Sequence, residues 1–255
     1  MLRQKKIKLI LGLFVLMLLN GCAYKIFFWE RNIWEDMQGI FTMVEPADLT
    51  LYRELLPEQF SMPEQPMVGV FVIDYLDTEP WLITLTKPLR PYLEASIFLR
   101  CNYEDQTGWY SLTMPVTTKA ANIGGRRIGF PKYVADRITL EQTGIGWIGR
   151  VVHQGESPIS LEFTAVPLTD IGELISIHEE FVKGQGDAEL KGPVILLDPP
   201  GEGPKVRVIT SSPPPLAIRQ TGMVRIVLAE PWNRLVPEGT ISPGLFQRCT
   251  LGADK

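Results

Sequence analysis

Short apolar stretches, separated by turns rich in glycine and proline, dominate the chain from residue 67 to residue 228, and the stretch 67–77 is apolar on both of its faces. Short apolar runs bounded by turn residues are typical of β-strands. Many short strands with few helices predict a mainly β fold, built as a closed, mostly antiparallel barrel or sandwich. We expect strands at 67–77, 81–86, 92–101, 110–117, 138–140, 145–152, 158–166, 193–197, 205–210 and 223–228.

Two segments show the spacing of a helix instead. The first covers 49–56, where Asp48 is a suitable N-cap, leucine and tyrosine side chains share one face, and Pro57 ends the helix. The second covers 171–183, after a start that resembles a capping box at Asp170 and Glu173. Beyond Trp232 the pattern gives no assignment to helix or strand.

The N-terminus has the organisation of a bacterial lipoprotein leader. Four basic residues lie within the first eight positions, an apolar run covers 9–19, and Leu19-Asn20-Gly21-Cys22 resembles a lipobox. The apolar run is about half the length that a membrane-spanning helix needs. We therefore expect a signal peptide at 1–21 and a lipid anchor on Cys22, which favours the outer membrane of the bacterial envelope, on its periplasmic face. The alternative is an uncleaved anchor.

The remaining chain divides into an arm and one domain. Residues 22–46 contain several aromatic residues without clean periodicity, and we expect them to form a tether or arm that packs on the barrel or lies at the membrane. Residues 47–255 form the barrel domain, since 255 residues with 45% hydrophobic content support a single large core.

Charge and cysteine content exclude several function classes. The leader carries four of the positive charges in a chain whose net charge is already −4, so the mature protein has no basic stripe and nucleic acid is not an expected partner. The two histidines and the cysteines show no metal-ligand spacing, and no nucleotide motif occurs, so we expect no metal and no cofactor. Cys101 and Cys249 either pair as a disulfide or leave Cys101 as a buried thiol.

The candidate chemistry lies in the string Gly124-Gly125-Arg126-Arg127-Ile128-Gly129-Phe130-Pro131-Lys132-Tyr133. Its glycines and its proline predict a stiff, tightly bent connector that ends at Lys132. Apolar neighbours, Phe130 among them, desolvate this lysine and favour its neutral amine. A neutral amine can attack a carbonyl carbon and form a Schiff base. The alternative is an ordinary turn with a solvated lysine.

This string resembles the signature of the acetoacetate decarboxylase family, which reads Gly-Arg-Glu, two residues, then Gly-Phe/Tyr-Pro-Lys-Lys. Lys132 stands at the position of the family's Schiff-base lysine, which is itself a known case of an amine activated by desolvation or a cationic neighbour. Tyr92-Leu93-Glu94 resembles the strand that presents a carboxylate to the pocket, at a matching distance along the chain. The resemblance implies a closed, cone-shaped barrel and a lysine that works together with Glu94.

The same resemblance assigns further residues and reveals two departures. Arg126 or Arg127 would bind the substrate carboxylate, and Phe130 would line the substrate site. Tyr133 replaces the family's second lysine, and Phe71 stands where the family has another acidic pocket residue, with Asp74 nearby in sequence.

The function expected from the resemblance is a carbon–carbon lyase, a decarboxylase that acts on a small keto acid through Lys132 and Glu94. Relatives with altered pockets suggest Schiff-base aldol or dehydration chemistry as an alternative. A second alternative is a non-catalytic envelope barrel that binds a small acid, and a third is an interaction protein that uses its aromatic arm. The expected partners are this small molecule and the membrane, through the lipid on Cys22, with a homo-oligomer as a further expectation from the family.

Overall fold

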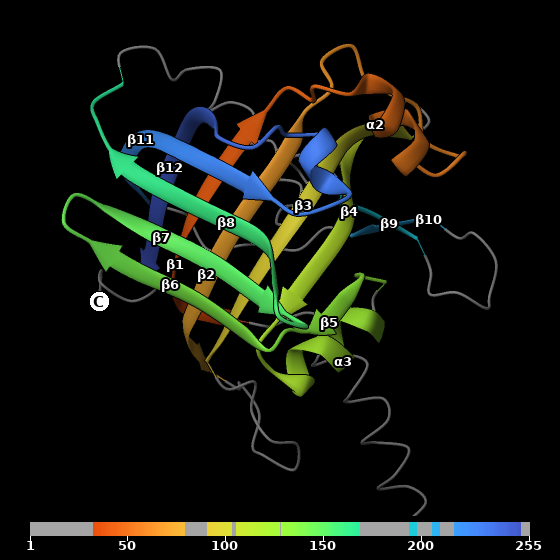
Figure 1. The fold of residues 1–255 in the computed structure, drawn as a ribbon. Helices are drawn as coiled ribbons and strands as arrows, with labels where there is room; N and C mark the ends of the chain where they lie inside the picture. The colour runs from red at the N-terminus through yellow and green to blue at the C-terminus, as the bar shows by residue number, and fades with distance from the viewer. Residues whose placement is uncertain are drawn as a thin grey trace, which may run out of the picture.

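The computed structural model describes residues 33–79, 91–103, 106–127, 129–168, 194–197, 206–209 and 217–250. These residues form twelve strands of one sheet with two α-helices and one 3₁₀-helix (Figure 1). In chain order the elements are β1 (Ile33–Val44), α2 (Leu49–Leu55), β2 (Val68–Glu79), β3 (Tyr92–Tyr103), β4 (Gln106–Val116), α3 (Lys119–Arg127), β5 (Lys132–Val134), β6 (Arg137–Thr143), β7 (Gly146–His153), β8 (Glu156–Ala165), β9 (Val194–Leu197), β10 (Val206–Ile209), β11 (Ala217–Leu228), η1 (Trp232–Arg234) and β12 (Thr240–Thr250).

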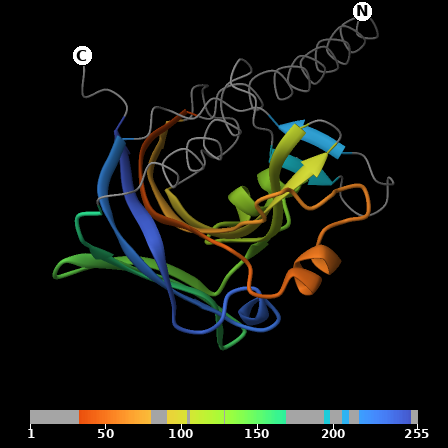
Figure 2. The same ribbon diagram turned by 90° about the horizontal axis from the view of Figure 1, so that it is seen from above.

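The sheet is mostly antiparallel and strongly curled. Its hydrogen-bonded order is β10-β9-β4-β3-β2-β1-β12-β11-β8-β7-β6, and β5 adds to β4 in parallel. The curl brings the layer β6–β8 and β11 over the layer β1–β4, as the views in Figures 1 and 2 show. The predicted mainly β fold is confirmed. Among the described residues the hydrogen-bonded order does not return from β6 to β10, so the closed cone stays a prediction.

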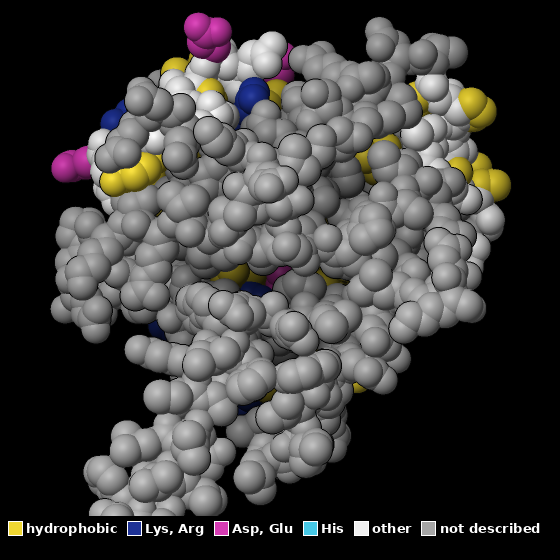
Figure 3. Space-filling view, turned by 180° about the vertical axis from the view of Figure 1, so that it is seen from behind, with side chains coloured by type: hydrophobic (Ala, Val, Ile, Leu, Met, Phe, Trp, Pro, Cys, Tyr) yellow, Lys and Arg dark blue, Asp and Glu magenta, His cyan; other side chains and the backbone are white. Residues whose placement is uncertain are grey.

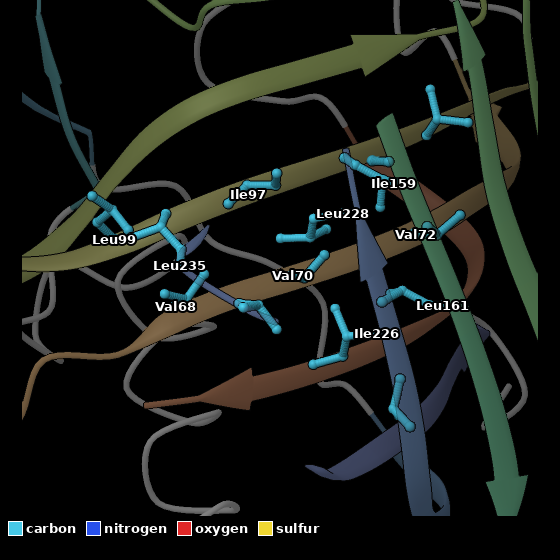
Figure 4. Close-up of a cluster of buried hydrophobic side chains, with 14 of the residues drawn as sticks. Val68, Val70, Val72, Ile97, Leu99, Ile159, Leu161, Ile226, Leu228 and Leu235 are labelled. Carbon is cyan, nitrogen blue, oxygen red and sulfur yellow. The ribbon is translucent and has the colours of Figure 1, made fainter. Parts of the chain in front are cut away.

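Alternation along the strands creates one apolar cluster on each face of β1–β4. Inside the curl, Val68, Val70 and Val72 of β2 pack with side chains of β3, β8 and β11 in what we call the inner cluster (Figure 4). The labelled members in that figure are Val68, Val70, Val72, Ile97, Leu99, Ile159, Leu161, Ile226, Leu228 and Leu235. The odd-numbered Phe71, Ile73 and Tyr75 point to the opposite face, where a second cluster forms with Met37, Phe41, Phe98, Trp109 and Met114. We call this second cluster the outer cluster.

Both ends of the described chain supply central strands. β1 lies between β2 and β12, and β12 lies between β1 and β11. Residues 33–44 therefore belong to the sheet and not to a tether, which corrects the expected domain start at 47. Trp34 is already in β1, and the tail beyond Trp232 contains β12, which the sequence pattern does not reveal.

Several finer predictions can be checked. Asp48 caps α2 by accepting a 2.8 Å hydrogen bond from the amide of Leu51, as the pattern predicts. Cys101 is a free, buried thiol. No helix in the described part of the chain is long and apolar enough to cross a membrane. The expected leader, the strand at 81–86 and the helix at 171–183 lie outside the described residues.

Candidate active site

The candidate site begins at the end of helix α3. The amide of Phe130 donates to the carbonyl of Gly125 at 3.0 Å, and the amide of Gly129 donates to the carbonyl of Arg126 at 3.2 Å. Gly129 has a φ of 100°. Two such bonds around a residue of positive φ make a Schellman cap, which satisfies helix carbonyls and turns the chain sharply. The tightly bent connector is thus confirmed at Gly129, whereas Gly124 and Gly125 lie in the helix and not in the bend.

The turn continues into β5 and directs Lys132 back toward the helix. Pro131 cannot extend a helix, and the amide of Lys132 donates to the carbonyl of Phe130 at 2.7 Å in a three-residue turn. The amide of Met114 then donates to the carbonyl of Pro131 at 3.3 Å, and β5 pairs in parallel with β4. Backbone bonds on both sides therefore fix the point from which the lysine side chain starts.

The lysine side chain passes directly under α3. A Cβ atom placed on Gly125 would lie 2.2 Å from Cδ and 2.5 Å from Cε of Lys132. Carbon atoms not bonded to each other normally approach to about 3.5–4.0 Å. Helix α3 therefore packs directly against the Lys132 side chain at Gly125, where the helix has no side chain of its own.

At the end of this path, Nζ of Lys132 forms an ion pair and hydrogen bond with Oε2 of Glu94. Lys132 is 9% exposed and Glu94 is 5% exposed, so solvent screens this pair poorly. Buried charges persist only where they are paired. The structure therefore brings together the two residues that the sequence pattern selects, although they lie 38 positions apart.

Aromatic rings surround the pair. Nζ of Lys132 lies 5.5 Å from the centre of the Phe130 ring and 5.9 Å from that of Tyr92. Tyr92 stacks on Tyr75 with ring centres 4.6 Å apart. Burial, and after it the negative charge of Glu94, raises the pKa of Tyr75 well above its usual value. Tyr75 therefore stays a neutral phenol, and the site is a small charged centre in an apolar, aromatic wall.

Figure 3 shows the molecule from the side opposite to that of Figure 1. Near the middle of this view hydrophobic, basic and acidic side chains of the described residues come together. The pair Lys132 and Glu94 belongs to the face of the sheet that carries the outer cluster, because Glu94 lies opposite Ile73 of that cluster in the β2–β3 register.

The remaining predicted site residues lie differently. Phe130 is half-buried with its ring beside the amine, as expected for a residue that lines the site. Arg126 is exposed on α3, so the structure does not bring it to the pair. Arg127 is the last residue of α3, and its side chain lies outside the described part.

Tyr133 lies on the face of β5 opposite to Lys132. Consecutive strand residues point to opposite faces, and the ring of Tyr133 packs against His153 with centres 4.7 Å apart and against the inner cluster. Burial raises the pKa of its phenol. A lysine at this position of the chain would therefore point away from the Lys132 amine, so its replacement by tyrosine leaves the immediate surroundings of Lys132 unchanged.

The second pocket carboxylate is absent from the two positions that the sequence suggests for it. Phe71 is buried in the outer cluster, with its ring centre 5.6 Å from that of Phe98. Asp74 alternates with Ile73 and Tyr75 on β2 and therefore points to the opposite face from Glu94. Glu94 is thus the acidic partner that the structure gives to Lys132. In the described part of the chain no group of three or more His, Cys, Asp or Glu side chains could hold a metal ion.

Comparison with known proteins identifies the family. The family model described as acetoacetate decarboxylase matches residues 30–173, more than half of the chain. The chain belongs to the acetoacetate decarboxylase family. No curated protein matches it significantly. The match includes both Lys132 and Glu94, together with the helix cap between them.

Solved structures support the family fold. An acetoacetate decarboxylase from Legionella pneumophila subsp. pneumophila str. Philadelphia 1 is similar, with 19% identity, a TM-score of 0.61, and coverage of 86% of this chain and 82% of the other. An acetoacetate decarboxylase-like enzyme from Sphingomonas wittichii RW1 has 14% identity, a TM-score of 0.57, and coverage of 84% and 87%. The enduracididine biosynthesis enzyme MppR, complexed with pyruvate, has 16% identity, a TM-score of 0.55, and coverage of 84% and 85%. At these identities the likeness shows a shared fold.

Two features of the site are not evident in the sequence. Gly125 receives the lysine side chain, which no local pattern shows, because the contact depends on the path of the chain after the helix cap. Tyr75 joins the site through its register with Tyr92 across two strands. The alternation of β3 does place Tyr92 on the same face as Glu94, so Tyr92 could have been found from the sequence.

Proposed function

We propose that this member of the acetoacetate decarboxylase family is a carbon–carbon lyase that acts on a small keto acid through a Schiff base on Lys132. The observation that carries the proposal is the buried pair of Lys132 and Glu94 at the end of the family's lysine motif. An amine at a fixed position beside one carboxylate, in an aromatic wall, has both a nucleophile and a group that can exchange protons with it.

The proposed reaction uses these two side chains in sequence. Glu94 takes a proton from the Lys132 ammonium, and the free amine attacks the ketone carbon of the substrate. Loss of water leaves an iminium, whose nitrogen accepts the electron pair when the bond to the carboxylate breaks and CO₂ leaves. The resulting enamine takes a proton on carbon, and water hydrolyses the new iminium to release the ketone and regenerate the amine of Lys132.

An aldol or dehydration reaction is the second candidate. It shares the enamine, which then attacks an aldehyde carbon instead of taking a proton. The replacement of a pocket carboxylate by Phe71 favours an altered reaction. In support, the similar enduracididine biosynthesis enzyme MppR has a solved structure in complex with the condensation product of pyruvate and imidazole 4-carboxaldehyde. A barrel that binds a small acid without turnover is the third candidate, because the described part of the pocket keeps one carboxylate.

Borohydride trapping tests the proposal and separates the candidates. The protein without residues 1–21 is incubated with acetoacetate, pyruvate and longer keto acids, reduced with borohydride, and mapped by mass spectrometry. We expect a reduced adduct on Lys132, no adduct in Lys132→Arg, and CO₂ release with at least one β-keto acid. An adduct without CO₂ but with aldehyde consumption indicates the aldol candidate. The absence of any adduct across the panel contradicts Schiff-base chemistry, and retained ligand binding in Lys132→Ala then indicates the binding barrel.

We also propose that a lipid on Cys22 anchors the protein to the membrane. The lipobox-like sequence Leu19-Asn20-Gly21-Cys22 supports this proposal. The full chain is expressed with labelled palmitate in a bacterium with an outer membrane. We expect label in the membrane fraction for the natural sequence and none for Cys22→Ala. Equal labelling of both chains contradicts the anchor and leaves the proposed reaction unaffected.

A further inference from the structure

We propose that Gly125 is a positioning residue for Lys132: the missing side chain at this position of α3 leaves the space in which the lysine methylenes run to Glu94. The inference rests on the proposed function and deepens it, because it concerns the same lysine and assigns a role to a glycine in the helical part of the motif. Gly125 itself touches the side chain of Lys132 and not its reacting amine, so its effect on reactivity acts through the lysine.

The observation is a steric conflict that involves three carbon atoms at once. A Cβ atom on Gly125 would lie 2.2 Å from Cδ, 2.5 Å from Cε and 2.9 Å from Cγ of Lys132. All three distances are far below a normal contact between carbon atoms. A methyl group at this position therefore excludes the present path of the lysine side chain.

Neither partner of this contact can move aside at low cost. The far end of Lys132 is held by Glu94, and its backbone is held by the turn at Phe130 and by the pairing of β5 with β4. On the other side, the carbonyl of Gly125 accepts the amide of Phe130 in the helix cap. A larger residue at 125 must therefore either push the amine away from Glu94 or lift the end of α3 from the sheet.

The neighbouring glycine provides a matched control. Gly124 lies in the same helix turn, and a Cβ atom placed on it would meet nothing within 4 Å. Neither glycine has a positive φ, so alanine suits the backbone at both positions and is the better helix former. The two substitutions Gly125→Ala and Gly124→Ala thus add the same methyl group to the same helix, and they differ in whether that group meets Lys132.

The first test measures the reactivity of Lys132 without any proposed substrate. The protein is modified with trace acetic anhydride at several pH values, and acetylation of Lys132 is quantified by mass spectrometry against the exposed Lys119. We expect a changed pH profile of Lys132 in Gly125→Ala and an unchanged profile in Gly124→Ala. Identical profiles of both variants and the natural protein would overturn the inference.

Borohydride trapping supplies the second readout. With a keto acid that traps the natural protein, we expect Gly125→Ala to lower the trapping rate by about 100-fold, the loss known for displacements of about 1 Å in reacting groups. Gly124→Ala should trap at the natural rate. If the natural protein forms no adduct with any keto acid, the proposed function fails, and the acetylation profiles still decide the role of Gly125.

A suppressor experiment keeps the inference testable if Gly125→Ala folds poorly. The effect of Gly125→Ala on the urea midpoint is measured in the natural background and in Lys132→Ala, whose short side chain no longer fills the space under α3. We expect a large decrease in the natural background and little change in Lys132→Ala, because the steric conflict needs both side chains. Equal decreases in the two backgrounds would overturn the inference.

Discussion

Breaking the pair of Lys132 and Glu94 from either side should destabilise the protein strongly, whereas removing both charges should not. The perturbations are Glu94→Met, Lys132→Met and the double variant, since methionine is an unbranched, uncharged side chain of similar size to both. Each single variant leaves one charge in a site where its neighbours are aromatic and apolar and where the two residues are 5% and 9% exposed. The double variant replaces the pair by apolar groups of similar size.

The magnitude follows from this burial. Leaving one member of a buried ion pair without its partner typically costs about 3–5 kcal/mol, and replacing the whole pair by apolar residues is often neutral or favourable. At a urea dependence of about 2 kcal/mol per molar, each single variant should lower the unfolding midpoint by about 2 M. The double variant should recover most of this loss, so the two substitutions should be clearly non-additive.

Urea unfolding followed by circular dichroism measures all four proteins. A control uses the exposed pair of Arg234 and Asp48, whose closest nitrogen and oxygen atoms are 2.5 Å apart, with 57% of the Arg234 side chain exposed. Arg234→Met should shift the midpoint little, because solvent screens this pair. The reasoning would be refuted if the single variants at Lys132 and Glu94 lowered the urea midpoint as little as the control does. It would also be refuted if the double variant lost as much stability as the two single variants together.

Three further predictions concern single positions. Gly129→Ala should lower the free energy of unfolding by about 1–3 kcal/mol because it forces a side chain into a positive φ, while Gly144→Ala, which meets nothing within 4 Å, should be nearly neutral in the same urea experiment. Tyr133→Lys should leave the rate of borohydride trapping at Lys132 unchanged, because Tyr133 occupies the other face of β5; faster trapping would contradict this orientation. Burial raises the pKa of the Cys101 thiol to about 12, so its thiolate is scarce below that pH, and a protein with no other cysteine should resist iodoacetamide at pH 8 until it is unfolded.

The strands of the sheet were largely predictable because most of them are short apolar runs bounded by turn residues, even where both faces of the strand are buried. In β2, Val70 and Val72 enter the inner cluster while Phe71 and Ile73 enter the outer cluster, and such a strand is recognised by its apolar run and its bounding turns. β1 also buries both of its faces, but the sequence shows no clear turn signals at its bounds, so it was not recognised as a strand. Its residues Ile40 and Phe41 belong to different clusters, which removes the simple alternation.

Two other elements escaped prediction for local reasons. β12 contains Pro243 and Gly244 inside a central strand, where both residues are normally unfavourable. Helix α3 contains Gly124 and Gly125, which lower helix propensity, and its position depends on the packing of Ala121 and Gly125 on the sheet. In both cases tertiary contacts override a local preference that the sequence shows.

The candidate site was predictable in its two charged residues and not in its surroundings. The motif selects Lys132, and the spacing along β3 selects Glu94, so the ion pair needed no further information. The absence of a second carboxylate and the orientation of Tyr133 depend on strand faces, which require the register of β2 and β5. A shift of one residue in the register of β2 would reverse the first conclusion, and a shift of one residue in the register of β5 would reverse the second.

The pairing of β1 with β12, the first and last described strands, joins two halves of the sheet. One half runs from β1 to β10 in the hydrogen-bonded order, and the other runs from β12 to β6. Thr42 and the carbonyl of Pro243, which share a 2.9 Å hydrogen bond, are separated by 201 positions. A nascent polypeptide therefore cannot complete the described sheet until β12 has emerged, and until then each half has an open edge at which chains can associate. Shortening the C-terminus by the length of one strand should consequently separate the two halves, even though the lysine and its carboxylate partner lie in the first of them.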